Sequence, residues 1–441
     1  MVFVVLYVGE KYTVKRNMKI QSYMNAQNRW YKRVVLLVFS VLSFVMGAFA
    51  QVDYEFWFAA PYGNIDHAPQ WPDGYPYKVG GRPIYLRLAT QDADADVTVT
   101  LPALGITIAN LSIEANGTAS VDLTPFIDNI QCSKEGNVKE DKGIYIRSNA
   151  LITAYYEIAS VLNTDIFSLK GQNALGKEFY TPFQNKMSND TYHNKGMGEE
   201  LPTSEFPHQG GVNGNHISDS AFSYIVIVAT QDNTTVNITP TANCVGITAG
   251  STKSVKLDRG QTYVVRAKGQ DINSRLSGTH IVSTKPIAVT IGEDSAYPDY
   301  YTKSGDCEDY IGDQIVPAAV TGRDYVIFQG KGFKSSAQGG NQGNDFKEIA
   351  TITATKDNTV VSVNGAQYGP TLSKGQTISI EIEENDLYTF IHANNPVYAF
   401  QISGYQCEVA GAILPSIEMC TGSYKMGFVR TYGSQNAQEF Y

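Results

Sequence analysis

The chain has 441 residues, of which 43% are apolar and 17% charged, a balance typical of globular proteins with two to four domains. Its net charge of −9 becomes −15 without the first 50 residues, which carry seven basic side chains and one acid. Such an acidic chain, without a basic patch, does not fit nucleic-acid binding, which requires neutralised phosphates. The 39 glycines and 28 tyrosines favour strands and turns over helices.

An apolar run, VVLLVFSVLSFVMGAFA, occupies residues 34–50, follows three basic residues and ends in a small-x-small motif. This pattern predicts a signal peptide within residues 1–50, with its start at Met24 and cleavage before Gln51. The alternative is a membrane anchor, since about 20 apolar residues span a bilayer. We therefore expect an exported chain and leave residues 1–50 out of the fold prediction.

The remaining chain contains three similar units. Each begins with an opening strand, EFWFAAP (55–61), EFYTPFQ (178–184) or DYVIFQG (324–330), and continues with an Ala-Thr-(Gln/Lys)-Asp phrase. The phrases are LATQDADADVTVT, VATQDNTTVNIT and TATKDNTVVSVN, and their Asp residues (Asp92, Asp232, Asp357) are 140 and 125 positions apart. Because a solenoid repeat is far shorter, these units have the size of domains.

Alternation within the units predicts strands with one buried face, for example at Val236 and Ile238. We assign Asp232 and Asp357 a structural role in turns rather than a ligand role. Turns at DRGQ (258–261) and SKGQ (373–376) correspond to each other. The last segment of each unit, such as GTHIVSTKPIAVTIG, is expected to be a hairpin, because a Lys-Pro or Asn-Pro turn or its equivalent divides it.

These observations predict an all-β protein of tandem β-sandwich-like modules, three related units with long inserted loops. The expected boundaries are 51–170 for module 1, 171–295 for module 2 and 296–423 for module 3, with 424–441 as the start of a truncated further module that begins on EFY. If the modules fold separately, a chain ending at Gly292 remains folded. The loops at 185–220 and 330–345 are the first places to expect binding.

Candidate ligand-binding side chains are aromatic residues in turn-like contexts, where rigid rings give contact area for sugars or proteins. They are Trp71, Tyr75, Tyr77, Tyr297, Tyr300 and Tyr301. The alternative is that these rings pack beneath their own loops.

Acidic clusters suggest a structural calcium ion, because Ca²⁺ prefers carboxylate oxygens. The better cluster consists of Asp306, Glu308, Asp309 and Asp313, and DADAD (92–96) is read as a solvated loop. No other cofactor is expected, since the three histidines of the first long loop lack metal-ligand spacing. Of five cysteines, Cys407 and Cys420 are the preferred disulfide, because they bracket a short segment.

No Gly-x-Ser-x-Gly motif or Cys–His signature is present, and we expect no enzyme. The phrases GDCEDYIGDQIVPAAVTGRDYV (305–326) and LPSIEMCTGS (414–423), with the Asp-Asn-Thr-x-Val repeats, resemble the N-terminal region of the IgGFc-binding protein family of mucus glycoproteins. The resemblance is to the bacterial version, in exported surface proteins of gliding-type Gram-negative bacteria, some of them similar to type IX secretion substrates.

This resemblance implies extracellular display and binding at the outer surface of the cell envelope, and brings no catalytic residues. The expected function is an adhesin for host glycoproteins, such as immunoglobulin Fc or mucin, or for glycans. The first alternative is a structural spacer within a larger surface protein, and the second is an extracellular hydrolase.

Overall fold

The computed structural model describes residues 51–63, 84–159, 165–189, 193–194, 199–200, 222–298, 309–329, 348–383, 387–405 and 408–419. All of them belong to one compact unit, Phe49–Tyr441. The expected signal peptide and the expected start of a further module lie outside the described residues. No helix in the described ranges is long and apolar enough to span a membrane.

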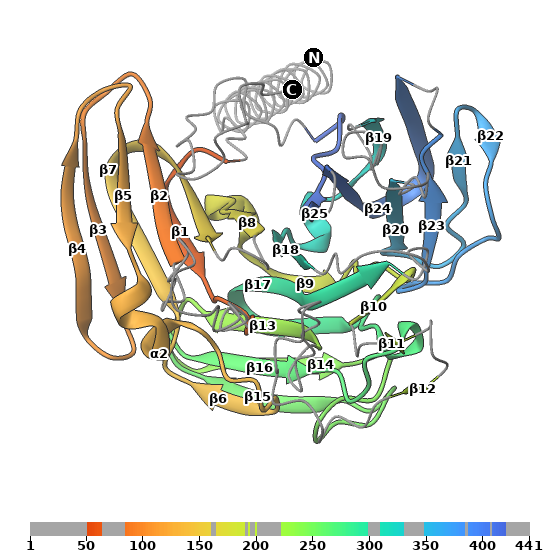
Figure 1. Ribbon diagram of the computed structural model, residues 1–441, viewed down its shortest axis with the longest axis horizontal. Helices are drawn as coiled ribbons and strands as arrows, with labels where there is room; N and C mark the ends of the chain where they lie inside the picture. Colours follow the sequence, from red (N-terminus) through yellow and green to blue (C-terminus); the bar gives the residue numbers. More distant parts are fainter. Residues whose placement is uncertain are drawn as a thin grey trace, which may run out of the picture. The chain divides into compact units, whose positions relative to one another are not determined.

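The first sheet, drawn from red to yellow in Figure 1, has the strand order β4-β3-β7-β2-β5, and β1 and β8 also pair with β7. Its strands are β1 (Asp53–Phe58), β2 (Ile84–Thr90), β3 (Ala95–Leu101), β4 (Ile106–Ile113), β5 (Thr118–Asp122), β7 (Ile144–Ile158) and β8 (Asp165–Ser168). The short helices η1 (Thr124–Phe126) and α2 (Ile127–Ile130) follow β5, and η2 (Gly171–Ala174) follows β8.

The second sheet has the order β15-β14-β17-β13-β16-β6, and β9, β10 and β18 also pair with β17. Its strands are β6 (Val138–Glu140), β9 (Gly176–Tyr180), β10 (Met187–Asn189), β13 (Ser223–Ala229), β14 (Thr234–Thr239), β15 (Lys253–Leu257), β16 (Thr262–Arg266), β17 (His280–Pro298) and β18 (Asp309–Ile315). The helix η4 (Ile272–Ser274) precedes β17, and β11 (His193–Asn194) pairs with β12 (Glu199–Glu200) in a separate ribbon.

The third sheet has the order β22-β21-β24-β20-β23, and β19 and β25 also pair with β24. The helix η5 (Ala318–Val320) precedes it. Its strands are β19 (Gly322–Phe328), β20 (Ile349–Ala354), β21 (Val361–Val363), β22 (Ala366–Gln367), β23 (Thr377–Glu381), β24 (Tyr388–Tyr405) and β25 (Glu408–Ile413). The three sheets thus repeat one topology, and the prediction of an all-β chain built from related modules is confirmed.

The predicted hairpin at the end of each unit is wrong, because the segment is one long strand: β7, β17 or β24. In module 2, residues 280–283 of β17 pair with β14, residues 287–293 with β13 and residues 289–296 with β18; β9 pairs with residues 280–282 and again with Ile287. Pro286 lies at the switch between the two sets of partners, where no ladder hydrogen bond needs its missing N–H. Its carbonyl oxygen instead accepts a bond from Thr230 Oγ1 at 2.7 Å.

The sheets do not divide the chain quite where the sequence analysis placed the module boundaries. Strand β18 lies within the segment assigned to module 3 but pairs with β17 of module 2. Strand β6 comes from the segment of module 1 and pairs with β16 of module 2. By its sheet, module 3 begins at β19. Modules 1, 2 and 3 are accordingly defined by the three sheets and their connections.

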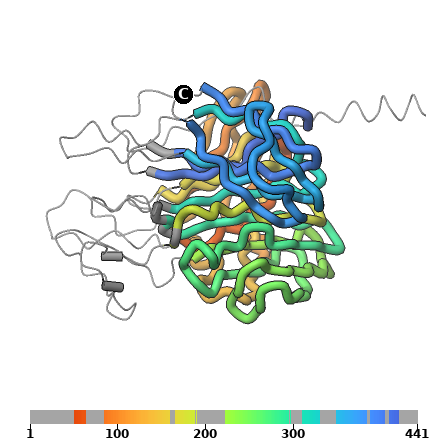
Figure 2. The backbone as a smooth tube through the Cα atoms, turned by 90° about the vertical axis from the view of Figure 1, so that its right-hand side faces the viewer, coloured from red at the N-terminus to blue at the C-terminus, as the bar shows by residue number. Residues whose placement is uncertain are grey.

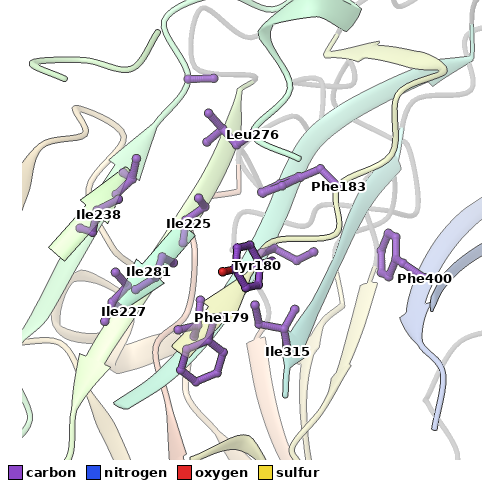
Figure 3. Close-up of a cluster of buried hydrophobic side chains, with 14 of the residues drawn as sticks. Phe179, Tyr180, Phe183, Ile225, Ile227, Ile238, Leu276, Ile281, Ile315 and Phe400 are labelled. Atoms are coloured by element: carbon purple, nitrogen blue, oxygen red, sulfur yellow. The ribbon is translucent and has the colours of Figure 1, made fainter. Parts of the chain in front are cut away.

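Apolar cores continue across the module boundaries. One buried cluster joins Phe179, Tyr180 and Ile315 of module 2 to Phe400 of module 3, and Figure 3 shows these side chains from β9, β18 and β24. Another cluster joins Trp57 of module 1 to strands β13 and β16 of module 2. The described parts of all three modules therefore pack as one body, as the tube in Figure 2 shows.

Candidate functional site

Most of the side chains chosen from the sequence lie outside the described residues. These are Trp71, Tyr75, Tyr77, Tyr300, Tyr301, Asp306, Glu308, Cys407 and Cys420. Tyr297 lies in β17 opposite Ser188 of β10, and Asp309 begins β18 opposite Ala296. The aromatic binding site and the disulfide therefore stay predictions.

Asp313, a proposed calcium ligand, is buried and binds groups of the protein. Its Oδ1 lies 2.7 Å from the ammonium of Lys170, and its Oδ2 accepts a bond from the backbone N–H of Ile413 at 2.9 Å. Burial raises the pKa of Asp313 and lowers that of Lys170, and their mutual attraction opposes both shifts. In this structure the ammonium group of Lys170, rather than a calcium ion, is the cation next to Asp313.

The neighbouring Gln314 completes a polar link between modules. Its Oε1 accepts a bond from the backbone N–H of Lys170 at 2.8 Å, and its Nε2 donates to the carbonyl of Trp57 at 2.7 Å. Strand β18 of module 2 is thus bound to module 1 through Lys170 and Trp57, and to module 3 through Ile413. We regard this cluster as structural, because its side chains bind other groups of the protein.

The described part of the chain contains two of the five cysteines. No group of three His, Cys, Asp or Glu side chains there is arranged to hold a metal ion. Cys132 and Cys244 are buried free thiols, and burial raises the pKa of Cys244 to about 12. Such a thiol is protonated at neutral pH and is a poor nucleophile.

A cation–aromatic contact at the boundary between modules 1 and 2 forms what we call the first clasp. Trp57 of β1 and Tyr145 of β7 are register partners, with ring centroids 4.5 Å apart. The guanidinium of Arg259, from the DRGQ turn of module 2, lies 5.0 Å from the Trp57 centroid and 5.2 Å from the Tyr145 centroid. Guanidinium groups at such distances are attracted by the ring electrons.

The DRGQ turn is held in shape from within module 2. Asp232 Oδ1 accepts a bond from the backbone N–H of Arg259 at 2.9 Å, and Gln261 Oε1 accepts one from the N–H of Asp258 at 2.9 Å. Gly260 has a φ of 82°, which favours glycine. The structural role expected for Asp232 is thereby confirmed.

The same turn is also fixed against module 1. The carbonyl of Gly260 accepts a bond from the N–H of Gly143 at 3.0 Å, and Gln261 Nε2 donates to Asp141 Oδ1 at 2.9 Å. A Cβ on Gly260 would lie only 2.8 Å from the backbone nitrogen of Ala103. Because module 1 and the rest of module 2 both constrain the turn, the backbone position of Arg259 is fixed without a ligand.

The boundary between modules 2 and 3 carries a second clasp of the same design. Tyr180 of β9 stacks on His280 of β17 with centroids 4.5 Å apart, and Lys374 of the SKGQ turn lies 5.9 Å from the Tyr180 ring. Asp357 Oδ1 accepts a bond from the N–H of Lys374 at 2.9 Å, as Asp232 does for Arg259. Trp57 and Tyr180 are the third residues of EFW and EFY, so the repeated phrase supplies the aromatic platform for the next module.

An open groove of about 400 Å³ lies beside the first clasp, and we call it the β3–β4 groove. It is lined by Thr98, Thr100, Leu101, Pro102, Gly105, Ile106, Thr107, Tyr145, Arg147 and Arg259. Its volume is within the range of small-molecule sites, about 300–1,000 Å³. A second cavity, next to Lys170 and Tyr398, measures about 30 Å³ and has room for no more than a water molecule or so.

Two guanidinium groups, those of Arg147 and Arg259, line this groove. Within the described residues, neither Arg147 nor Arg259 forms an ion pair or a side-chain hydrogen bond, and both side chains are exposed. Tyr145 lies near both: burial and its hydrogen bond to Glu55 raise the pKa of Tyr145, and the two arginines oppose this rise. The groove is therefore a positive site on an acidic chain.

Sequence reasoning missed this groove. Arg147 and Arg259 are 112 positions apart, and they approach each other only because module 2 docks its turn on the sheet of module 1. One signal was available: a basic residue precedes Gly-Gln in both DRGQ and SKGQ, and an aromatic residue follows Glu-Phe in both EFW and EFY.

A family model described as IgGFc binding protein matches residues 169–430, more than half of the chain. The chain belongs to the IgGFc-binding protein family. The match covers modules 2 and 3 of this family member, and module 1, which precedes it, repeats the same strand order. The resemblance noted in the sequence is confirmed at the level of the family, and the bacterial origin stays a prediction.

The other comparisons add little. No curated protein matches the chain. Among solved structures, a β-glucuronidase from Bacteroides uniformis shares 11% identity over 65% of this chain, with a TM-score of 0.13. The chain spans only 28% of that enzyme's length. So low a score supports neither a common fold nor a common activity.

Proposed function

We propose that this IgGFc-binding family member is an extracellular binding protein that recognises host glycoproteins, of the immunoglobulin Fc or mucin type, or their glycans, without catalysis. The observation that carries the proposal is the family match over modules 2 and 3. The β3–β4 groove is consistent with it, because it is open, carries two guanidinium groups and is formed by two modules. Export by a signal peptide, display at the cell surface and secretion by the type IX route belong to the same proposal.

Binding of the compact unit, residues 51–441, to immobilised immunoglobulin Fc, mucin and a glycan panel tests this function. We expect a saturable signal for at least one member of the panel. Turnover of a glycan or peptide would instead favour the hydrolase alternative. The absence of any binding would contradict the proposal.

Deletion of the first long loop should be limited to residues 191–220. A deletion from residue 185 would remove β10, in which the buried Asn189 donates to the carbonyl of Asp294 at 2.8 Å. The second deletion covers residues 331–346. If binding is lost in one of them while the melting temperature is unchanged, that loop contains the receptor site.

One observation favours the spacer alternative. The cores continue from module to module, and β18 is bonded to both neighbours, so the modules are suited to transmit force as one body. A spacer would show no saturable binding to any member of the panel. The binding experiment therefore separates the two functions.

A further inference from the structure

We propose that the β3–β4 groove binds a saccharide that carries a carboxylate. This inference rests on the proposed function and names the ligand class and the site for it. The groove is lined by residues of β3, β4 and β7 in module 1, the strands at the left in Figure 1, and by Arg259 from the DRGQ turn of module 2. Apart from Arg259, its lining residues lie outside the region matched by the family model, residues 169–430.

The charges of the groove select an anion. The guanidinium groups of Arg147 and Arg259 have no carboxylate partner in the described residues. Two acids share this face. Glu55, the register partner of Arg147 on β1, accepts a hydrogen bond from Tyr145, and Asp96 of β3 accepts bonds from Ser112 and Asn149. Guanidinium forks bind carboxylates through paired hydrogen bonds, which makes a carboxylate the fitting ligand group.

The remaining lining selects a sugar ring rather than a bare ion. Thr98 and Thr100 lie on one face of β3, at a spacing of two residues, and Thr107 follows on β4. The hydroxyls of Thr98 and Thr100 donate to Asn110 Oδ1 at 3.0 Å and to the Tyr145 carbonyl at 3.3 Å, and their oxygens can still accept hydrogen bonds from sugar hydroxyls. Ile106 and the Tyr145 ring, both partly exposed, supply apolar surface for the C–H face of a sugar.

The groove is also preorganised, because Arg259 is already held in position without a ligand. The backbone of Arg259 is held by Asp232, and its side chain lies over Trp57 and Tyr145. A preorganised site loses less conformational freedom on binding than a flexible one. This matters for a saccharide, whose individual contacts are weak.

The second clasp provides a natural comparison within the same chain. It has a cation, Lys374, over the aromatic Tyr180, but Val282 pairs with Glu178 where Arg147 pairs with Glu55 in module 1. The second boundary therefore lacks the second guanidinium. If a carboxylate needs two arginines, only the first boundary binds it.

Titration of residues 51–441 with sialyllactose, a glucuronic acid disaccharide and uncharged lactose tests the inference, with binding followed by NMR line broadening and calorimetry. We expect one or both acidic sugars to bind and lactose to bind at least about tenfold more weakly. The two acidic probes distinguish a terminal sialic acid from a uronic acid. Arg147→Gln should weaken acidic-sugar binding about tenfold or more, and Lys374→Gln should leave it unchanged.

Arg147 is exposed and unpaired within the described residues, so its replacement should not disturb folding, and a melting curve of Arg147→Gln checks this. Equal affinity for lactose and the acidic sugars, or unchanged binding by Arg147→Gln, would overturn the inference. Binding to Fc or mucin that persists in Arg147→Gln and after removal of acidic sugars would refute this site but leave the proposed function intact. No binding to anything on the panel would refute both.

Discussion

At the scale of single residues, charged groups are used in two opposite environments. Lys170 and Asp313 are buried, where each charge is tolerated only because the other is 2.7 Å away. Arg147 and Arg259 are exposed and have no acid partner in the described part of the chain, so water screens them and a ligand can reach them. The buried pair links neighbouring modules, and the exposed arginines are available to bind a ligand.

Replacing Lys170 with Met should destabilise the protein by about 3–5 kcal/mol at pH 7, because it leaves the Asp313 carboxylate buried without its partner. Burial already raises the pKa of Asp313, and the loss of Lys170 raises it further. When the pKa of a carboxyl is higher in the folded than in the unfolded state, the folded protein loses stability as pH rises from the unfolded-state pKa through the folded-state pKa. The defect should therefore shrink as pH falls toward about 5.

Urea unfolding of Lys170→Met and of the unmutated chain at both pH values measures this effect. Lys177→Met is the matched control, since Lys177 is exposed and should change stability by less than about 0.5 kcal/mol. A destabilisation of Lys170→Met that is small, or that grows on acidification, would contradict the prediction.

At the scale of elements, the strand and turn chemistry of each module follows largely from the sequence. The opening strands appear as β1, β9 and β19, and the alternation in VATQDNTTVNIT places Val236 and Ile238 in the core. The final hairpins were mispredicted because proline next to polar residues indicates a turn. In the structure those residues mark the place where a continuous strand changes its partners, which depends on contacts far along the chain.

Asp232 of the repeated phrase is hydrogen-bonded to the DRGQ turn, and the contribution of this bond to stability can be measured. Asp232→Ala removes the acceptor for the N–H of Arg259 and should cost about 1 kcal/mol. Asp232→Asn keeps an oxygen in the same position and should cost only a few tenths of that. Thermal or urea unfolding of the two variants gives the comparison, and equal losses would show that the bond does not stabilise the turn.

Two glycines test the packing between modules 2 and 3. Gly278 and Gly365 have φ angles of 76° and 86°, so alanine is strained at both, at a cost of about 1–2 kcal/mol. A Cβ on Gly278 would overlap the carbonyl oxygen of Gly375 in the SKGQ turn, whereas a Cβ on Gly365 meets nothing within 4 Å. Gly278→Ala should therefore cost a further 1–3 kcal/mol or so.

Unfolding free energies of the two variants isolate the effect of the module contact from that of the backbone strain. Gly365→Ala is the control, because it carries the strain alone. If the two substitutions destabilise the protein equally, the turn of module 3 moves away from Gly278 at no cost, and the boundary is looser than the structure indicates.

At the scale of the whole molecule, related modules in tandem do not form a string of independent domains. The sequence predicted the three units because each repeats its own local phrases. It could not show that β18 is bonded to both neighbouring modules, since Asp313, Lys170 and Ile413 belong to three different parts of the chain. The β3–β4 groove was hidden for the same reason, as it depends on docking between modules.

Because cores cross both boundaries, we expect residues 51–441 to unfold in a single cooperative transition rather than in three. Phe400 of module 3 packs in one cluster with Ile315 and Tyr180 of module 2, so the loss of either module exposes apolar surface on the other. A chain that ends at Gly292 is a stricter test. It cuts β17, which runs from His280 to Pro298, and lacks β18 altogether.

We expect this shortened chain to aggregate or to melt without cooperativity, contrary to the expectation drawn from the sequence alone. Calorimetry and size-exclusion chromatography provide the measurement, and a chain that ends at residue 419 is the control, since it retains every described strand. A monomeric, cooperatively melting product of the cut at Gly292 would mean that the shared cores contribute little to folding. The modules would then be separable, and the groove beside the first clasp would have to persist without module 3.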